Sequence, residues 1–273
     1  MIVRDGASIP PVLRPFVKRL WFSNESARPS NGLVARERVL PTGTMSLVFR
    51  VSDHPLRLFD TDGTESRTVG HAIVGGARTS YYVRDVSHPT RSVGAQLHPG
   101  AAELLLGAPA GELAERHTRL DDLWGHAAEE ARERLAAAGS DTALDLLQTL
   151  LIARLPKMRG IHPAVAHALA RFATTGHVNK VVDESGYCHR RFIALFRESV
   201  GLSPKVYCRV LRFQTAIDRI ADDPEMPWAS LAAASGYSDQ PHFTRDFGAF
   251  TGVTPGAYRR IRPAVRNHVP IEA

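Results

Sequence analysis

The stretch over residues 228–258 constrains the fold of this chain more than any other, because it holds two short helical segments separated by a glycine turn. Small apolar residues over 229–233 predict the first helix, and Gly236 supplies the left-handed conformation that ends it. Asp239 then begins a second helix, with Pro241 in the first turn, where the missing N–H would have no helical partner anyway. The segment therefore predicts a pair of short helices with a tight turn.

The second of these helices has one apolar face and one polar face. Phe243, Phe247 and Phe250 fall at i, i+4 and i+7, which predicts a buried stripe. The polar residues that lie off this stripe and are available to a partner are Gln240, His242, Thr244 and Arg245. A short helix followed by a steeply angled helix with a polar face is typical of a helix-turn-helix unit, whose second helix fits the major groove of DNA.

The same pattern occurs a second time about 50 residues upstream, as an internal repeat. The matching segments are Ser185-Gly186-Tyr187 with Ser235-Gly236-Tyr237, Phe192 with Phe243, Phe196 with Phe247, and Gly201-Leu202-Ser203-Pro204 with Gly252-Val253-Thr254-Pro255. We therefore expect two helix-turn-helix units, a first unit at about 177–201 and a second unit at about 227–252. A helix over 205–221 of roughly 25 Å would join them. Each unit could then enter one of two successive major grooves, which lie about 34 Å apart.

The distribution of charge separates the two halves of the chain. Residues 1–156 carry 18 Lys and Arg against 18 Asp and Glu, whereas residues 157–273 carry 16 against 10, so the net charge of +6 lies in the C-terminal half. A basic domain beside a neutral one favours double-stranded DNA as the partner of the former. Pro156 and Gly160 bracket a short basic segment that we interpret as a hinge between domains 1–156 and 157–273.

The N-terminal half reads as a β-rich domain followed by helices. Turn residues separate short extended runs at a spacing typical of an antiparallel sandwich or small barrel. The predicted strands cover 16–22, 35–40, 45–51, 56–59, 67–74, 81–86 and 92–97, and the predicted helices cover 101–106, 111–117, 127–138 and 142–155. The last helix has a leucine stripe, which either packs on the barrel or pairs two subunits of a homodimer. A barrel of this kind can enclose a small-molecule effector. The candidate lining residues, each with core or surface packing as the alternative, are Trp21, Arg38, Phe49, His71, Tyr81 and Tyr82.

Cysteine content and hydropathy bear on the compartment. Cys188 and Cys208 are the two cysteines of the chain and both fall in predicted helices, so they build neither a disulfide framework nor a four-cysteine zinc site. No run of about 18 apolar residues occurs, and the N-terminus has no signal-peptide pattern. We expect a cytoplasmic protein with no membrane association.

The second unit resembles the corresponding unit of AraC/XylS-family transcription regulators. The residues that carry the resemblance are Gly236-Tyr237-Ser238-Asp239-Gln240, His242-Phe243-Thr244-Arg245-x-Phe247 and Gly252-x-Thr254-Pro255-x-x-Tyr258-Arg259. The N-terminal half resembles more loosely the β-rich module of one branch of that family, through Arg38-Val39-Leu40-Pro41-x-Gly43 and Leu97-x-Pro99-Gly100-Ala101-Ala102. The resemblance implies a one-component regulator of α+β class. A small cupin-like β-barrel with appended helices would sense or dimerise, and an all-α domain of two helix-turn-helix units would bind DNA. It implies no cofactor, and RNA polymerase as a partner if the protein activates transcription.

The first unit departs from the family pattern at two positions. Cys188 stands where the family has a serine cap, and Ala194 stands at the position that matches Arg245. A poor cap weakens the helix start by about 1 kcal/mol, and a lost arginine contact weakens DNA binding by about 1 to 3 kcal/mol. Arg190 and Arg191 offer charge nearby instead. The residues predicted to contact DNA are His189, Arg190, Arg191, Ile193, Ala194, Arg197, Ser238, Gln240, Pro241, His242, Thr244 and Arg245.

Several of these assignments have alternatives. The arginines of the first unit could form a solvated face, Arg245 could form a surface ion pair, and His242 could cap its helix instead of contacting phosphate. Asp239 would repel phosphate and is expected to cap the helix.

Two further functions compete with effector-controlled DNA binding. His54, His71, His88 and His98 lie in the β-rich half, so a metal-dependent cupin-type enzyme is one rival. Their spacing is wide, and no phosphate loop or Gly-x-Ser-x-Gly motif is present, so we predict neither catalytic residues nor a metal site. The other rival is an N-terminal domain that only dimerises or binds a protein, with constitutive DNA binding.

Overall fold

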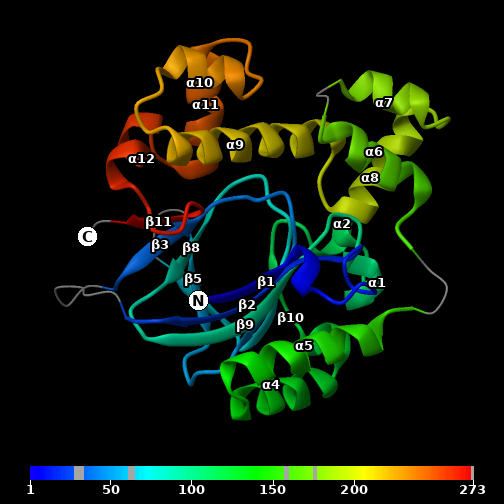
Figure 1. Ribbon diagram of the computed structural model, residues 1–273, viewed down its shortest axis with the longest axis vertical. Helices are drawn as coiled ribbons and strands as arrows, with labels where there is room; N and C mark the ends of the chain where they lie inside the picture. Colours follow the sequence, from blue (N-terminus) through cyan, green and yellow to red (C-terminus); the bar gives the residue numbers. More distant parts are fainter. Residues whose placement is uncertain (28–33, 61–64, 157–159, 175–176, 272–273) are drawn as a thin grey trace.

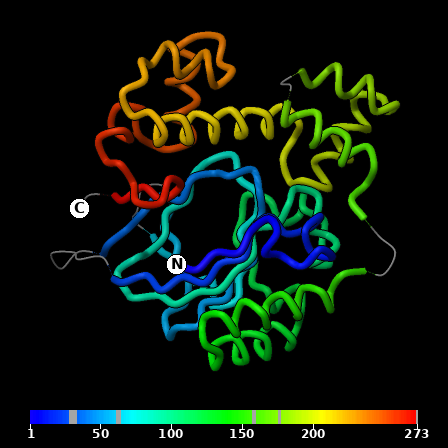
Figure 2. The backbone as a smooth tube through the Cα atoms, in the orientation of Figure 1, coloured from blue at the N-terminus to red at the C-terminus, as the bar shows by residue number. Residues whose placement is uncertain are grey.

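The protein has a β-rich half with helices on one side and a helical half on the other (Figure 1). A computed structural model describes residues 1–27, 34–60, 65–156, 160–174 and 177–271. The chain trace shows the long helix α9 running across the top of the β-rich half, with a helical cluster at each of its ends (Figure 2). Helices α4 and α5 lie on the opposite side of the sheets from α9 (Figure 1).

Two antiparallel sheets form the β-rich half. The six-stranded sheet has the order β1-β2-β9-β4-β7-β10, and the five-stranded sheet has the order β11-β3-β8-β5-β6. The strands of the first sheet are β1 (Ile2–Asp5), β2 (Val17–Glu25), β9 (Thr90–Leu97), β4 (Ser46–Arg50), β7 (Ala72–Gly75) and β10 (His117–Arg119). The strands of the second are β11 (His268–Ile271), β3 (Arg36–Val39), β8 (Tyr82–Asp85), β5 (Leu56–Phe59) and β6 (Ser66–Gly70). This two-sheet arrangement, with the helical region that follows it, confirms the predicted fold class.

The structure corrects the sequence interpretation at two places. The run predicted as one strand over 67–74 is two strands in different sheets, because Gly70 adopts a φ of 144° and the chain crosses from β6 to β7. The helix predicted over 111–117 is α2 (Ala110–Leu113) alone, because Glu115 has a φ of 61° and His117 opens strand β10. In both cases a left-handed residue redirects the chain.

The helices of the N-terminal half pack partly on the six-stranded sheet and partly against the C-terminal half. They are η1 (Gly6–Ser8), α1 (Ala102–Leu106), α2, α3 (Asp121–Trp124), α4 (Ala127–Ala137) and α5 (Ser140–Arg154). Helix α5 packs on β2 and β9, and its residues Leu144, Leu147 and Leu151 are fully buried. These three leucines of the stripe therefore pack within the chain, whereas Leu155 is half-buried, and the pairing of two subunits stays a prediction.

The C-terminal half consists of seven helices among the residues that the structure describes. They are α6 (Pro163–Phe172), α7 (Val178–Glu184), α8 (His189–Val200), α9 (Pro204–Asp222), α10 (Trp228–Ala234), α11 (Gln240–Thr251) and α12 (Pro255–Ile261). The predicted hinge over 156–160 falls mostly outside the described residues. No helix of the described chain is long and apolar enough to cross a membrane.

The chain returns to the β-rich half after its last helix. Strand β11 pairs antiparallel with β3, in a register that places His268 opposite Val39, and Val269 is fully buried. The two halves also share one continuous apolar core. The tail of the C-terminal half (residues 265–271) is thus an integral part of the N-terminal sheet, which the sequence did not predict.

Candidate DNA-binding surface and ligand cavity

The second helix-turn-helix unit consists of α10 and α11. Asp239 is the N-cap of α11, and its carboxylate accepts the backbone N–H of His242 at 2.7 Å. This hydrogen bond lowers the pKa of Asp239. Gly236 ends the preceding helix with a φ of 79°, and Phe243 and Phe247 are fully buried against the core. The predicted cap, turn and apolar stripe are all confirmed.

Burial divides the predicted contact residues of the second unit into two groups. The exposed residues are Ser238, Gln240, Pro241, Thr244 and Arg245. His242 is half-buried, because its ring lies 3.1 Å from the hydroxyl of Ser238 and 3.7 Å from the carboxylate of Asp246. Arg245 forms no ion pair or hydrogen bond within the described chain. An exposed arginine without an internal partner can bond to a base edge or a phosphate.

The first unit consists of α7 and α8 and has a weaker helix start. Cys188 occupies the N-cap position but makes no side-chain capping hydrogen bond. The exposed residues of its second helix are His189, Arg190, Arg191, Ala194 and Arg197, whereas Ile193 is half-buried. Arg191 lies 5.4 Å from the centre of the Tyr187 ring. A band of three arginines is therefore presented to solvent without acidic partners among the described residues.

Helix α9 contacts both units and holds them together. Its Arg209 donates two hydrogen bonds to the buried carboxylate of Asp246, at 2.7 and 3.2 Å. Two residues earlier on α9, Tyr207 packs edge-on against Phe196 of the first unit. The pair of Arg209 and Asp246 was not predicted from the sequence, although Asp246 lies next to the buried Phe247 in α11. A bidentate pair of this kind holds the orientation of α11 relative to α9.

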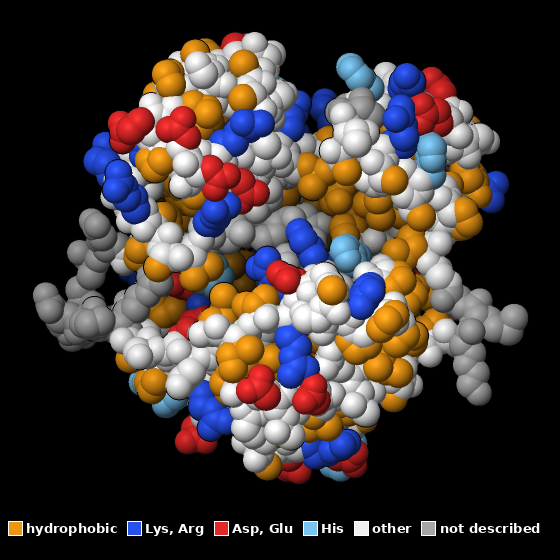
Figure 3. All heavy atoms as spheres, viewed as in Figure 1, with side chains coloured by type: hydrophobic (Ala, Val, Ile, Leu, Met, Phe, Trp, Pro, Cys, Tyr) orange, Lys and Arg blue, Asp and Glu red, His pale blue; other side chains and the backbone are white. Residues whose placement is uncertain are grey.

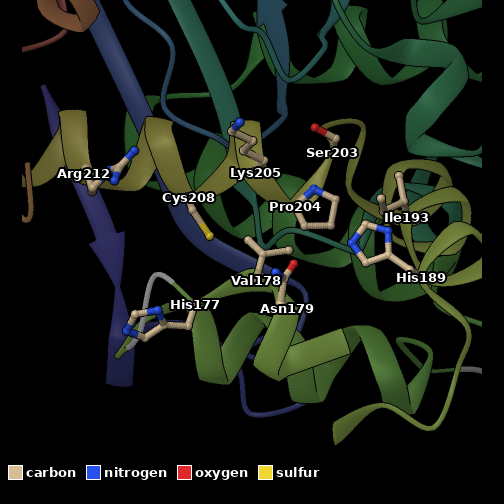
Figure 4. A pocket seen from close by; sticks show the side chains of 10 residues that line it. All are labelled: His177, Val178, Asn179, His189, Ile193, Ser203, Pro204, Lys205, Cys208 and Arg212. Carbon is tan, nitrogen blue, oxygen red and sulfur yellow. The ribbon is translucent and has the colours of Figure 1, made fainter. Parts of the chain in front are cut away.

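A groove of about 530 Å³ lies between the first unit and α9 (Figure 4). His189 and Ile193 of α8 line one side, and the side chains of Lys205 and Arg212 from α9 line the other. Lys205 is exposed. Neither cation of α9 was among the predicted contact residues, because a helical period alone does not show which side of a linking helix faces its neighbours.

The molecular surface shows the two units as separate lobes above the β-rich half, with a notch between them (Figure 3). Lys and Arg side chains are visible on both lobes (Figure 3). The C-terminal end of each recognition helix, in contrast, rests on the β-rich half. A Cβ at Gly201 would lie 2.9 Å from Met45, and a Cβ at Gly252 would lie 2.7 Å from the ring of Tyr81. Each lobe thus has a contact with the N-terminal half at the end of its recognition helix.

A second concave site, of about 280 Å³, lies within the β-rich half. Trp21 and Tyr82, two of the six candidate lining residues, border this cavity. The Trp21 ring lies over Gly94, where any Cβ would collide with it. The cavity wall also carries hydroxyl and amide groups, and the side-chain amide of Gln96 donates a hydrogen bond to Thr44 at 2.8 Å.

The other four candidate lining residues do not border the cavity. Phe49 points to the opposite face of its sheet, 6.3 Å from the ring of Trp124. The guanidinium of Arg38 lies over the ring of Tyr81, 5.4 Å from its centre, and Tyr81 itself packs against Gly252. The ring of His71 lies 3.2 Å from the carbonyl of Asp53. These residues serve packing and the contact between halves.

The tail forms part of the cavity wall. Val265, Asn267 and His268 line the cavity together with the strands of both sheets. Gln214 of α9 donates a hydrogen bond to Asn267 at 2.9 Å and another to the carbonyl of Pro41 at 2.7 Å. The cavity is therefore in direct contact with a segment that continues from the helical half.

A buried ionic cluster ties the tail to the sheet. Arg84 donates to Glu37 at 2.5 Å and to Glu25 at 2.8 Å, and the ring of His268 lies 2.8 Å from the same oxygen of Glu37. Burial alone would lower the pKa of Arg84, but the two carboxylates outweigh it and raise that pKa. Glu37 is 1% exposed. The contact of His268 with Glu37 holds β11 in one position on the sheet.

The metalloenzyme alternative gains no support from the geometry. Within the described ranges, no group of three or more His, Cys, Asp or Glu side chains is arranged to hold a metal ion. Of the four histidines considered for such a site, His54 and His88 stack on each other at 4.1 Å, and the ring of His71 lies 3.2 Å from the carbonyl of Asp53.

Residues 165–261 match the family described as helix-turn-helix domain (HTH_18). The C-terminal half is an AraC-type helix-turn-helix domain. This protein is accordingly a DNA-binding transcription regulator. Residues 9–119 match a second family, described as a domain of unknown function (DUF6597).

Three solved structures of ToxT from Vibrio cholerae are similar to the chain. ToxT from strain O395 is 11% identical over 92% of this chain and 100% of its own, with a TM-score of 0.46. ToxT bound to (E)-4-(8-methylnaphthalen-1-yl)but-3-enoic acid is 12% identical over 88% of this chain and 98% of its own, with a TM-score of 0.46. Fatty-acid-bound ToxT from strain SCE256 is 12% identical over 88% and 94%, with a TM-score of 0.47. A search among curated proteins found no match.

Proposed function

We propose that this AraC-type regulator binds two successive major grooves of one DNA site and that a small molecule in the β-rich cavity alters this binding. The observation that carries the proposal is the shared wall of the cavity, which the β-rich half builds together with Val265, Asn267 and His268 of the tail. A ligand in the cavity would therefore touch both halves of the protein. A ligand shifts a conformational equilibrium only through contacts that differ between the two states.

The exposed face of each recognition helix supports the DNA-binding part of the proposal. In the second unit we assign base contacts to Gln240, Thr244 and Arg245, and in the first unit to Arg190 and Ile193. Ser238, Pro241, His189, Arg191, Ala194 and Arg197 complete the proposed interface, and His242 is assigned to phosphate contact or to support of the helix start. The 19 residues of α9 span about 28 Å at 1.5 Å per residue. That length is close to the separation of about 34 Å between successive major grooves on one side of a duplex.

The groove beside the first unit extends this interface. Lys205 and Arg212 line the groove opposite His189 and Ile193, so a DNA strand that follows α8 would pass close to both cations. Lys205 is exposed, whereas Arg212 is half-buried, with its guanidinium 5.3 Å from the centre of the Tyr237 ring. Cations beside a recognition helix typically contact phosphates and add affinity without base preference. We therefore assign phosphate contacts to Lys205 and Arg212.

Selection of bound sequences from a random DNA pool tests the DNA-binding part. The full chain should enrich a site with two half-sites about 10 base pairs apart, centre to centre. Footprinting should then show protection on one side of the duplex. Recovery of sequences without any shared motif would contradict sequence-specific binding by this protein.

Thermal unfolding against a panel of small metabolites tests the effector part. A compound that binds the folded protein raises the unfolding temperature in proportion to RT ln(1 + [L]/Kd). Each such compound is then added to a binding titration with the selected DNA. A compound that stabilises the protein should change the DNA affinity. Unchanged affinity for every stabilising compound would instead support constitutive DNA binding, with the N-terminal half as a dimerisation or protein-binding module. A homodimer, RNA polymerase contact and a cytoplasmic location remain predictions.

A further inference from the structure

Three arginines border the cavity of the β-rich half, and they differ in how their charge is balanced. Arg84 has Glu37 and Glu25 as hydrogen-bonded partners, and Arg19 lies 3.9 Å from the carboxylate of Asp5. Arg78 also lines the cavity, yet no carboxylate lies within ion-pair distance of it among the described residues. Of these three arginines, Arg78 is the one that the described chain leaves without a carboxylate at ion-pair distance.

The groups around Arg78 are either neutral or bonded to another partner. It donates one hydrogen bond to Nδ1 of His117, at 2.9 Å, and lies 5.1 Å from the centre of the Tyr82 ring. Burial, with the nearby charges of Arg78 and Arg67, lowers the pKa of His117 to about 3, so this histidine is a neutral acceptor. The carboxylate of Glu115 acts on Arg78 through its charge, but it accepts a hydrogen bond from the backbone N–H of Thr79.

Arg78 is half-buried, and its Nε is shielded from solvent without a hydrogen-bond partner in the described chain. A guanidinium held partly away from water without a counter-charge is costly, and proteins that retain one generally pair it with an anion. The wall around it supplies what a small organic ligand needs besides charge. Trp21 offers an aromatic surface, and Ser46, Thr44 and Gln96 offer hydroxyl and amide groups. A volume of about 280 Å³ is near the lower end of small-molecule sites.

We infer that the ligand of this cavity is a small organic oxyanion, a carboxylate or a phosphate ester, whose charged group pairs with Arg78. This inference rests on the proposed effector site and specifies the chemistry that the site selects. Guanidinium groups bind both kinds of oxyanion through paired N–H donors. A neutral analogue of the same shape would leave Arg78 unpaired and would bind more weakly.

The first test needs no ligand. The full-length Arg78→Met variant should unfold at the same temperature as the wild type or a few degrees higher, because it removes a half-buried charge that no carboxylate balances. Arg84→Met, which strips a paired arginine from the same cavity, should lower that temperature. If Arg78→Met lowers the unfolding temperature as much as Arg84→Met does, the charge of Arg78 is already balanced and the inference is overturned.

The second test compares matched probes at about 10 mM each in thermal unfolding. Benzoate and phenyl phosphate should raise the unfolding temperature of the wild type, whereas benzamide and benzyl alcohol should not. The comparison of benzoate with phenyl phosphate distinguishes carboxylate from phosphate recognition. Arg78→Met should abolish the shifts. Arg116→Met, which removes an exposed arginine from the neighbouring loop, should retain them.

Two results would overturn the inference: no shift with either oxyanion, or an equal shift with benzamide that Arg78→Met keeps. The second result would leave the effector proposal intact, because a neutral ligand would still occupy the cavity. Failure of the effector proposal looks different. Oxyanions would then stabilise the wild type through Arg78 and leave its affinity for the selected DNA unchanged.

Discussion

The ring of His268, in the last strand of the chain, lies 2.8 Å from the carboxylate of Glu37 in the N-terminal sheet. The two residues are separated by nearly the whole sequence, and between them lies the complete AraC-type domain. Their contact joins the end of the DNA-binding half to a strand that borders the cavity of the β-rich half. The position of the tail is thereby coupled to the electrostatics of the cavity wall.

Substitution of Glu37 should therefore destabilise the protein strongly. Glu37→Gln keeps the shape of the side chain but leaves Arg84 with Glu25 as its single acidic partner. Because Glu37 is 1% exposed, we expect a loss of about 3 kcal/mol in the free energy of unfolding, measured in urea.

Asp5→Asn is the matched control, since it removes the acid of an exposed pair with Arg19, whose atoms lie 3.9 Å apart. Exposed pairs contribute less than about 1 kcal/mol. Equal effects of the two substitutions would show that the cluster at Glu37 has no special role in holding the tail.

Removal of the Arg245 side chain should weaken specific DNA binding without affecting the fold. The residue is exposed and has no internal hydrogen bond or ion pair in the described chain. We expect Arg245→Ala to reduce affinity for the selected site by about 1 to 3 kcal/mol and to relax base preference at one position. Arg134→Ala removes the same charge from α4, on the far side of the sheets (Figure 1), and should leave the affinity unchanged. Equal losses for both variants would indicate a purely electrostatic effect.

The first unit should tolerate an arginine at the position equivalent to Arg245. Ala194 is exposed on α8, so a longer side chain there meets no core residue. Ala194→Arg should bind the selected DNA as tightly as the wild type or more tightly, by up to about 3 kcal/mol. A filter-binding titration at fixed salt measures this. Weaker binding by tenfold or more would mean that Ala194 is packed against the DNA, and the proposed orientation of α8 would be wrong.

The sequence predicted the helix-turn-helix units well, because their determinants are local. The cap at Asp239, the turn at Gly236 and the stripe at Phe243 and Phe247 all lie within 12 residues of one another. Each of these features restricts the backbone or the burial of its own helix, so short-range reasoning locates the exposed face without knowledge of the remaining chain.

The cavity was predicted poorly, because its wall depends on pairings between distant strands. Phe49 and Val48 are adjacent on β4 and both look like core residues, yet Phe49 packs under α3 while Val48 faces the cavity. Both faces of that sheet are covered, so the alternation of apolar side chains along a strand does not show which side chains face the cavity and which face the helices. The position of the tail was not predicted for the same reason, since the short strand β11 is formed by pairing with the distant strand β3.

Lys205 should contribute to DNA affinity through charge alone. It is exposed at the mouth of the groove between α8 and α9. Lys205→Ala should weaken binding to specific and random DNA by similar factors, and should reduce the slope of log K against log salt concentration by about 1. Titrations at several salt concentrations give the slope. A loss confined to the specific site would assign Lys205 to base recognition instead.

The stability of the β-rich half should fall in mild acid because of His117. Its folded pKa is about 3, since burial disfavours the charged ring, whereas an unfolded histidine has a pKa of about 6.5. Between these values the unfolded state binds the additional proton, so stability is lost as pH falls from about 6.5 towards 3. The expected slope from this residue is at most about 1.4 kcal/mol per pH unit.

Urea unfolding of His117→Gln between pH 7 and pH 4 isolates this contribution. Glutamine keeps a polar group beside Arg78 but has no proton to gain, so the free energy of unfolding should fall less steeply with acid than in the wild type. His126→Gln, at a ring that is 85% exposed, should follow the wild-type curve. Parallel curves for the wild type and His117→Gln would show that the ring of His117 takes up its proton without unfolding. The assignment of His117 as a neutral acceptor for Arg78 would then be wrong.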